Sequence, residues 1–442
     1  MLKDDRELRS AIYDSWPKNG LRIGYISSYP PRQCGIATFC EDLLRSASAH
    51  PAAGEPLVAA VTRPDEPHDH ERPVRHVFRE GSEEDAKAAA AFLNRAPIDV
   101  VSLQHEFGIY GGPESPALPS LLERLDKPVV TTLHTVVPDP SPAQRRAIRE
   151  IANRSERLVI MNALARSILA RDYGVDTRRV SFVHHGAPPP GQETREEAKR
   201  VLGLSDRSII LTFGLMGPGK GLEYALYALP EIRRAHPEAL YLIVGKTHPG
   251  VQRAGKESYR EHLAQVAREL QVADAVRFVD AYQTKGDIIR YLAAADIYLT
   301  PYLSPTQICS GTLAYAMAAG KAIISTPYLY AQFLLREDRG CLVPFRDAEA
   351  IARVASEILG NRSLQLGLEA RAREYGREMY WPVVGRRFVD LCAETLEAPV
   401  HLPEPVLAER SHQGQYAGLK GETWHAAERR QADVAGALAA AD

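Results

Sequence analysis

The sequence predicts an α/β fold with two domains, each built on a parallel β-sheet that helices cover on both faces. Three observations support this prediction. The chain has 442 residues, too many for one ordinary hydrophobic core and enough for two. Short β-branched and apolar runs alternate with helical patterns along most of the chain, as in parallel sheets. A Pro- and Gly-rich segment, GAPPPGQE at 186–193, can continue neither element and indicates the domain boundary.

The first domain is expected at residues 19–190, after a polar lead-in at 1–18. It opens with a strand, LRIGYIS at Leu21–Ser27, which a Pro/Gly loop, SYPPRQCG, joins to a helical pattern from Ile36 to Ala47. The strands expected next are VAAV at Val58, DVVSL at Asp99, PVVTTLH at Pro128, RLVIM at Arg157 and VSFVHHG at Val180, with helical patterns at Glu83–Asn94 and Pro142–Asn153. This alternation predicts a first parallel sheet.

The second domain is expected at residues 195–378 and opens with the strand RSIILTFG at Arg207. The further strands are ALYLIVG at Ala239, AVRFVD at Ala275, ADIYLTP at Ala295 and KAIIST at Lys321, with helical patterns between them. Residues 379–398 are predicted to form a C-terminal helix that packs back on the first domain. The apolar pattern then fades, so residues 399–442 are expected to form a disordered or loosely helical tail.

Composition excludes several classes of protein. A net charge of −2 with 45% hydrophobic and 25% charged residues describes an ordinary globular protein, without the field that gathers nucleic acid. No uncharged apolar run approaches the ~18 residues needed to span a bilayer, and the first 18 residues lack the apolar core of a signal peptide. The five cysteines form no CxxC pair, so reduced thiols and no zinc site are expected. These features predict a cytoplasmic protein.

The segment FGLMGPGKG at Phe213–Gly221 follows a strand and precedes a helix. Such a turn offers backbone N–H groups, a helix N-terminus and the cation of Lys220 to a phosphate. A lysine at a helix start is otherwise disfavoured by the helix dipole. The spacing nearly fits a P-loop, but Gly221 stands where Ser or Thr would hold magnesium. Phosphate binding is therefore predicted, and a P-loop NTPase remains a weaker alternative.

A second turn, Ser310-Gly311-Thr312, opens the helix that follows the strand ADIYLTP. The first turn of a helix has free N–H groups, and a glycine lets a ligand approach the backbone closely. Plain N-capping by Ser310 or Thr312, worth about 1 kcal/mol, would explain this turn equally well if it stood alone. Both turns, however, lie at carboxyl ends of parallel strands, where α/β sheets bind ligands.

Candidate residues of the first domain also follow strands. Gly35 begins a helix after a loop with two prolines, which suits backbone approach to a ligand or a simple turn. His105-Glu106 ends one strand and His134 ends the next. A lone histidine is more often structural, but two at adjacent strand ends beside an acid are candidate catalytic groups. His184–Gly186, at the domain boundary, is interpreted as mainly structural.

Taken together, these segments resemble the group 1 glycosyltransferases of sequence family GT4. The resemblance runs from about Leu21 to Leu396 and rests on RIGYISSYPPRQCGIATF, LQHEFGIYGG, VTTLHTV, VHHG, FGLMGPGKGLEYALYALPEI and ADIYLTPYLSPTQICSGTLAYAMAAGKAIISTPY. It implies the GT-B fold, in which two Rossmann-like domains face each other across the active site. It also implies transfer with retention of anomeric configuration and without a bound metal, because helix dipoles and basic side chains carry the charge of the leaving phosphate.

The resemblance implies a role for each candidate residue. Lys220 would contact the donor diphosphate, and Ser310, Gly311 and Thr312 would offer it N–H groups. Gly35 would approach the same phosphates from the first domain. His134 would lie beside the transferred sugar.

Three positions depart from the family pattern. Leu215 replaces an arginine that usually lies about five residues before the phosphate lysine, and Gln307 and Tyr315 replace two glutamates. In the family the first glutamate contacts the hydroxyls of the donor sugar and the second contacts the nucleotide ribose. An amide can still bind a sugar hydroxyl, whereas Tyr315 cannot supply a bidentate carboxylate to a diol.

The leading hypothesis is a cytoplasmic retaining glycosyltransferase that uses a UDP- or GDP-linked sugar and needs no cofactor. Its acceptor would be a small molecule, a glycan or a lipid-linked molecule, the last compatible with peripheral membrane contact. The catalytic candidates are His134, Glu106 and His105, and the donor-binding candidates are Gly35, Lys220, Gln307, Ser310, Gly311, Thr312 and Tyr315. The main alternative is a non-catalytic protein of the same fold that binds a nucleotide sugar or sugar phosphate.

Overall fold

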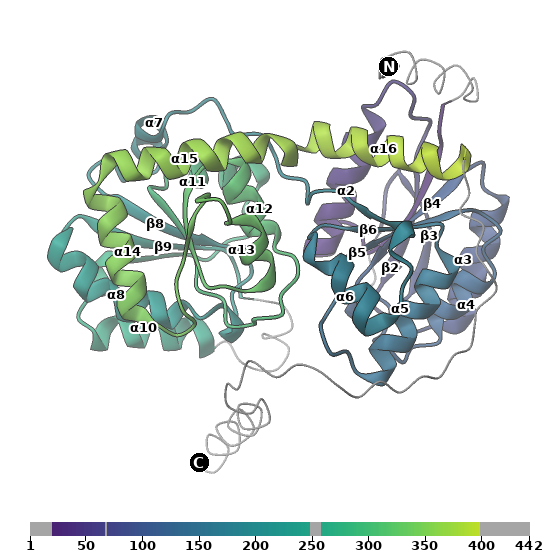
Figure 1. The fold of residues 1–442 in the computed structure, drawn as a ribbon, viewed down its shortest axis with the longest axis horizontal. Coiled ribbons are helices and arrows are strands. Elements are labelled where there is room, and N and C mark those ends of the chain that lie inside the picture. The colour runs from purple at the N-terminus through teal and green to yellow at the C-terminus, as the bar shows by residue number, and fades with distance from the viewer. Residues whose placement is uncertain (1–19, 67–68, 248–257, 398–442) are drawn as a thin grey trace, which may run out of the picture. The chain divides into compact units, whose positions relative to one another are not determined.

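The computed structural model describes residues 20–66, 69–247 and 258–397. The lead-in at 1–18 and the tail at 399–442 lie outside these residues. Two parallel β-sheets form the core, and helices cover both faces of each sheet (Figure 1). The predicted fold class, two Rossmann-like parallel-sheet domains, is confirmed.

The first sheet has the strand order β3-β2-β1-β4-β5-β6-β7, and all its strand pairs are parallel. Its strands are β1 Ile23–Ser27, β2 Leu57–Thr62, β3 Val74–Arg79, β4 Val100–His105, β5 Val129–Leu133, β6 Arg157–Ile160 and β7 Val180–Phe182. Its helices are α2 Gly35–Ser48, α3 Glu83–Arg95, α4 Ala117–Glu123, α5 Pro142–Arg154 and α6 Leu164–Tyr173, with short 3-10 turns at Phe107–Ile109 and Thr177–Arg179.

The second sheet repeats this order as β10-β9-β8-β11-β12-β13, again all parallel. Its strands are β8 Ser208–Phe213, β9 Ala239–Val244, β10 Val276–Val279, β11 Ile297–Thr300, β12 Ala322–Ser325 and β13 Cys341–Leu342. Its helices are α7 Arg195–Val201, α8 Leu222–Ala235, α10 Ser258–Glu269, α11 Lys285–Ala294, α12 Gly311–Ala318, α13 Leu329–Leu334, α14 Ala348–Gly360 and α15 Arg362–Gly376, with 3-10 turns at Pro218–Lys220, Ala273–Ala275 and Arg377–Met379.

The central strands are buried on both faces. Every residue of β1, β2 and β4 is buried, because helices lie on each side of the sheet. Burying one side chain such as Ile26 or Val101 stabilises the fold by roughly 1.5–3 kcal/mol relative to leaving it exposed. In each sheet the first three strands are added toward one edge and the later strands toward the other edge. The direction changes between β1 and β4 in the first sheet and between β8 and β11 in the second. Ligands of open α/β sheets bind at the carboxyl ends of the strands at such a point.

The last described helix, α16 at Trp381–Glu397, returns to the first domain and lies alongside α2 (Figure 1). Trp381, Phe388 and Cys392 of α16 share a buried cluster with Phe39 and Leu43 of α2. None of the described helices is both long and apolar enough to cross a membrane.

Gly385 allows the close approach of α16 to α2. A Cβ atom at this position would lie 2.3 Å from Ser46 Oγ and 2.7 Å from the Ser46 carbonyl carbon. We expect Gly385→Ala to lower the free energy of unfolding by about 1–3 kcal/mol, the usual cost of overpacking. Gly367→Ala on α15 is the control, because its Cβ would meet only the end of the Arg371 side chain at 3.6 Å and alanine favours a helix by up to about 1 kcal/mol. Thermal unfolding of both variants measures the difference, and equal midpoints would contradict the close contact.

Candidate functional site

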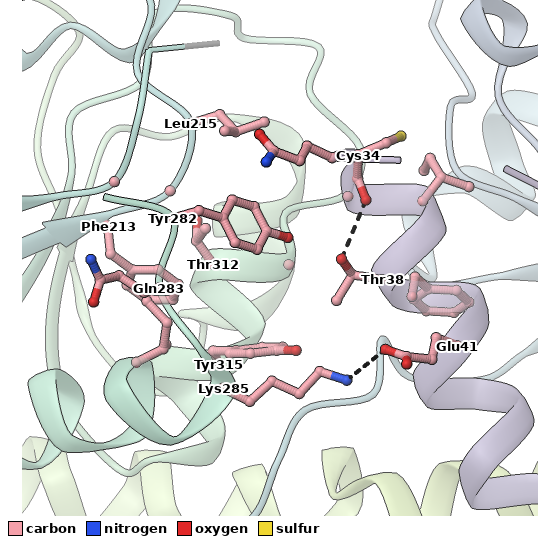
Figure 2. A pocket seen from close by; sticks show the side chains of 18 of the residues that line it. Cys34, Thr38, Glu41, Phe213, Leu215, Tyr282, Gln283, Lys285, Thr312 and Tyr315 are labelled. Atoms are coloured by element: carbon pink, nitrogen blue, oxygen red, sulfur yellow. Dashed lines mark hydrogen bonds and ion pairs between the residues drawn. The ribbon is translucent and has the colours of Figure 1, made fainter. Parts of the chain in front are cut away.

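A cavity of about 780 Å³ lies between the two domains at the carboxyl ends of both sheets. Figure 2 shows it with helix α2 of the first domain on one side and the loops and helices of the second domain on the other. Most of the candidate residues line this cavity: Gly35, Glu106 and His134 from the first domain, and Lys220, Gly311, Thr312 and Tyr315 from the second. His105, Gln307 and Ser310 are not among the lining residues.

The turn that carries Lys220 packs closely against the loop that follows strand β11. Gly214 and Gly221 have φ values of 126° and 60°, which glycine adopts without strain. A Cβ on Gly221 would lie 2.3 Å from the Pro301 carbonyl oxygen, so a larger residue would displace the turn. The Lys220 ammonium lies 3.8 Å from the centroid of the Tyr302 ring, a cation–π contact. No carboxylate in the described parts of the chain pairs with Lys220, which leaves its charge available to an anion.

The two phosphate-binding turns predicted from the sequence are in contact. The Tyr302 hydroxyl, beneath Lys220, shares a hydrogen bond of 2.9 Å with Thr312 Oγ1. A Cβ on Gly214 would lie 3.0 Å from the Thr312 methyl group. Ser310 Oγ accepts a hydrogen bond from the Leu313 N–H at 3.4 Å and so caps helix α12. The hydroxyl of Ser310 therefore has the structural role of an N-cap, while Gly311 and Thr312 face the cavity.

Glu106 follows β4 and is partly buried in the cavity wall. Its Oε2 accepts a hydrogen bond from the Thr135 hydroxyl, and it also interacts with the N–H groups of Phe107 and Gly108. Burial raises the pKa of Glu106, and these three hydrogen bonds oppose that rise. The carboxyl group is thus oriented by donors on the first domain alone.

His134 follows β5 and is buried beside the cavity. Its Nε2 lies 3.0 Å from the amide oxygen of Gln104, an acceptor, which assigns the proton to Nε2 and leaves Nδ1 as an acceptor. Burial, together with smaller contributions from the neighbouring His185 and His105, lowers the pKa of His134 to about 3. The ring is therefore neutral near pH 7.

His185 also lines the cavity, although the sequence interpretation assigned it a mainly structural role. Its Nδ1 donates to the Gly186 carbonyl oxygen at 2.7 Å, and burial lowers its pKa to about 4. A Cβ on Gly311 would lie 3.2 Å from the His185 ring, so the glycine lets the imidazole pack on the start of α12. Phe39 separates the two histidines, with centroid distances of 4.7 Å to His134 and 5.0 Å to His185. His185 lies just after strand β7, and this position is the feature of the sequence that could have identified it as a cavity residue.

The loop after β10 contributes cavity residues that sequence reasoning missed. Tyr282, Gln283 and Lys285 all line the cavity. Tyr282 is 51% exposed, and its ring projects into the space opposite Thr38 (Figure 2). Lys285 extends toward Glu41 (Figure 2). These residues follow the carboxyl end of a predicted strand, so the rule that located the other candidates could have located them too.

His105 and Gln307 lie away from this cavity. His105 is the last residue of β4, and neighbouring side chains of a strand point to opposite faces, so His105 points into the core while Glu106 faces the cavity. The His105 ring packs on Phe107 with centroids 4.8 Å apart, and burial lowers its pKa to about 3. The Gln307 amide donates to the Cys309 carbonyl oxygen at 3.0 Å within its own loop. The sugar contact implied for Gln307 stays a prediction.

The buried histidines make stability depend on pH. His184 packs between Phe182 and Tyr375 outside the cavity, and burial lowers its pKa to about 4. Below its ordinary pKa of ~6.5 the unfolded chain binds a proton that the folded chain does not, so stability is lost as the pH falls from about 6.5 toward 4. We expect His184→Phe to reduce the loss of unfolding free energy between pH 7 and pH 5 by on the order of 1–2 kcal/mol.

Denaturant unfolding of the wild type and the variant at both pH values checks this expectation. His262→Gln provides the control, because His262 is exposed on α10 and its ring is hydrated in the folded chain as well. An identical pH slope for the wild type and His184→Phe would show that His184 is not held neutral.

Two family models match the chain. Residues 35–189 match the model described as Glycosyltransferase Family 4, and residues 207–361 match the model described as Glycosyl transferases group 1. The first match covers strands β2 to β7 of the first sheet, and the second covers every strand of the second sheet. Together they include the residues that line the cavity between Gly35 and Tyr315.

Relatives with curated names are similar over most of this region. The chain is 28% identical to a phosphatidyl-myo-inositol mannosyltransferase of Mycolicibacterium smegmatis over 283 residues, which are 63% of this chain and 68% of the relative. It is 26% identical to D-inositol 3-phosphate glycosyltransferase 2 of Catenulispora acidiphila over 294 residues, 62% of this chain and 67% of the relative.

A solved structure shares the fold. Anabaena HepE in complex with UDP and glucose superposes with a TM-score of 0.67 at 15% identity, covering 84% of this chain and 99% of that one. The two sheets, the cavity between their carboxyl ends and the two matching family models lead to one assignment: this chain belongs to the group 1 glycosyltransferases of the GT4 type and has their GT-B fold.

Proposed function

We propose that this protein transfers a sugar from a nucleoside diphosphate sugar to an acceptor with retention of anomeric configuration. The observation that carries the proposal is the ammonium group of Lys220, which stands at the meeting point of two strand-end turns without a carboxylate partner among the described residues. Membership of the family and the cavity between the domains support the same reaction.

The second domain would bind the donor. Lys220 and the first turn of α12, at Gly311 and Thr312, would hold the diphosphate, because a cation and free helix N–H groups together neutralise a phosphate. The same groups would stabilise the charge that develops as the bond between the anomeric carbon and the phosphate oxygen breaks. Gly35 would bring the start of α2 to the phosphates from the first domain, since no atom lies within 4 Å of where its Cβ would stand.

The first domain would position the sugar and the acceptor. In front-face transfer the acceptor oxygen bonds to the anomeric carbon on the side that the phosphate leaves, and the acceptor proton passes to the leaving phosphate oxygen. His134, neutral and oriented by Gln104, would contact the transferred sugar. Glu106, oriented by Thr135, would accept a hydrogen bond from a hydroxyl of the acceptor other than the attacking one. His105 would support these two groups from the core rather than touch the substrates.

The identity of donor and acceptor is proposed only by class. The relatives named above act, by their names, on phosphatidyl-myo-inositol or D-inositol 3-phosphate, and the solved structure holds UDP and glucose. We propose a UDP- or GDP-linked hexose as donor and a small-molecule, glycan or lipid-linked acceptor. Binding of the nucleotide without transfer is the second candidate function, and the aliphatic side chain of Leu215 in the cavity wall favours it because it offers no donor to the phosphates.

A thermal-shift screen of UDP, GDP and their hexose conjugates tests donor binding. A ligand at 100 times its dissociation constant should stabilise the protein by about 2.7 kcal/mol. Product analysis with the best donor and candidate acceptors then separates transfer from binding alone, and nuclear magnetic resonance of the new glycosidic bond reports its configuration. Failure of every nucleotide and nucleotide sugar to shift the unfolding temperature would contradict the proposed donor site.

Activity is expected to survive chelation. Lys220 and the first turn of α12 would carry the charge of the leaving phosphate, and the described residues contain no group of three or more His, Cys, Asp or Glu side chains that could hold a metal ion. Assays of sugar transfer with excess EDTA, and after magnesium is added back, measure this. Complete loss of transfer that magnesium reverses would point to a metal-assisted reaction.

A further inference from the structure

A cluster of charged and polar side chains joins the two domains at the edge of the cavity. Helix α2 of the first domain carries Glu41 and Asp42, and helix α11 of the second domain begins at Lys285. The Lys285 ammonium lies 3.1 Å from Glu41 Oε2 and also donates to Asp42 Oδ1. Figure 2 shows the Lys285 side chain extended toward Glu41, next to the ring of Tyr315.

Asp42 contacts a second element of the opposite domain. The Tyr315 hydroxyl, on α12, donates to Asp42 Oδ2 at 3.4 Å. Lys285 and Tyr315 both line the cavity, whereas Asp42 does not. One carboxylate of the first domain therefore holds two cavity side chains of the second domain, each from a different helix.

Because Asp42 is buried, its ion pair with Lys285 is important for the arrangement of the side chains around it. The Asp42 side chain is 7% exposed, compared with 35% for Lys285. Burial raises the pKa of Asp42, and the hydrogen bond and charge of Lys285 lower it. A buried carboxylate without its cation is unfavourable, so the closed arrangement around Asp42 depends on Lys285. Salt screens such a pair less than it screens a pair at the surface.

The local sequence places Lys285 at this point. The Thr284 hydroxyl accepts from the Asp287 N–H at 3.1 Å, and the Asp287 carboxylate accepts from the Thr284 N–H at 3.2 Å. This capping box starts α11 at Lys285, so its side chain leaves the first turn toward α2.

We propose that Asp42 is an interdomain positioning residue that holds Lys285 and Tyr315 against α2 and so keeps this end of the cavity closed. The wall formed by α11 and α12 is then assembled before a donor arrives, which lowers the cost of ordering it on binding. The effect on the donor rests on the proposed function, whereas the closure of the ligand-free protein does not.

Other contacts hold the domains together in the absence of this cluster. The Asn162 amide donates to the Ile308 carbonyl oxygen at 3.2 Å. The Ser46 hydroxyl donates to the Trp381 carbonyl oxygen and so fixes α16, which follows the second domain in the chain, to α2 of the first domain. Loss of the Asp42 contacts should therefore loosen the start of α11 without separating the domains.

The first test is hydrogen exchange of the ligand-free, full-length protein. Asp42→Asn keeps the shape of the side chain and removes its charge, and Lys285→Met removes the cation. We expect faster amide exchange in residues 285–294 for both variants, with Lys285→Arg close to the wild type. Arg233→Met is the control, because it breaks a bidentate ion pair with Asp274 inside the second domain at 2.8 Å. Thermal unfolding confirms that each variant is folded.

The second test separates donor affinity from turnover. With a donor sugar, Asp42→Asn should raise donor KM by about tenfold, the effect of losing one charged hydrogen bond, and change kcat little. Lys285→Arg should retain the wild-type KM. Calorimetry with UDP and GDP gives the same comparison if the protein binds nucleotides without transferring sugar.

The outcomes distinguish the two proposals. Wild-type exchange of residues 285–294 in folded Asp42→Asn and Lys285→Met would overturn the positioning role, whatever the protein catalyses. Faster exchange with unchanged KM and unchanged nucleotide affinity would overturn its link to the donor. Absence of nucleotide binding in the wild type would contradict the proposed function. The exchange result would then still decide whether Asp42 keeps this end of the cavity closed.

Discussion

Replacing Lys220 with methionine is expected to lower kcat/KM for sugar transfer by about 10²–10³-fold while the protein stays folded, as when one donor to a developing oxyanion is removed. The ammonium has no carboxylate partner among the described residues, so its removal leaves no buried charge without a partner. What the fold loses is a cation–π contact with Tyr302, worth about 0.5–1 kcal/mol. Steady-state kinetics and calorimetry with the free nucleoside diphosphate measure the change.

Lys87→Met is the matched control for this experiment. Lys87 lies on the surface of α3, outside the cavity, where it pairs with Glu83 at 2.6 Å. Its loss should leave kinetics and affinity at wild-type values. If folded Lys220→Met binds the nucleoside diphosphate as tightly as the wild type, Lys220 is not a phosphate ligand and the donor site has been placed wrongly.

His134→Ala is expected to lower kcat by about 10²-fold or more and to leave the affinity for free UDP or GDP unchanged. His134 belongs to the first domain, and its neutral ring faces the cavity from the end of β5. It should therefore contact the sugar and the reacting bond, which the free nucleotide lacks. Turnover with the sugar donor and calorimetry with the nucleotide separate the two effects.

His105→Gln supplies the comparison on the neighbouring strand. His105 is 1% exposed and lies outside the cavity, so its replacement should lower the unfolding temperature more than it lowers kcat. The reverse order, with turnover more sensitive to His105 than to His134, would contradict the placement of the sugar beside His134.

The strands could be predicted because burial on both faces leaves a strong apolar signal. Each apolar run that the sequence analysis assigned to a strand is a strand in the structure, from β1 to β12. Two edge strands carried no such signal. In β3, VRHVFR at Val74–Arg79, exposed and buried residues alternate, and β13 has only two residues, Cys341 and Leu342. An edge strand covered on one side needs few apolar residues, so composition alone does not reveal it.

The direction of each side chain at a strand end was beyond the sequence. His105 and Glu106 are adjacent, as are His184 and His185, and in each pair only the second residue lines the cavity. Neighbouring side chains of an extended chain point to opposite faces, and which face meets the other domain depends on the register of the whole sheet. The sequence therefore located the pairs and not the members that face the cavity.

By itself, the sequence determined the parallel sheets, the glycine turns and the strand ends at which ligand-binding residues gather. These features follow from local chemistry: apolar periodicity, the freedom of glycine and the topology of strands alternating with helices. Only the tertiary structure brought Lys285 to Asp42, which lies 243 residues away in the chain, and Tyr315 to the same carboxylate. No spacing rule connects residues of two different domains, because their contact depends on how the domain surfaces fit, and that fit is a property of the packed molecule.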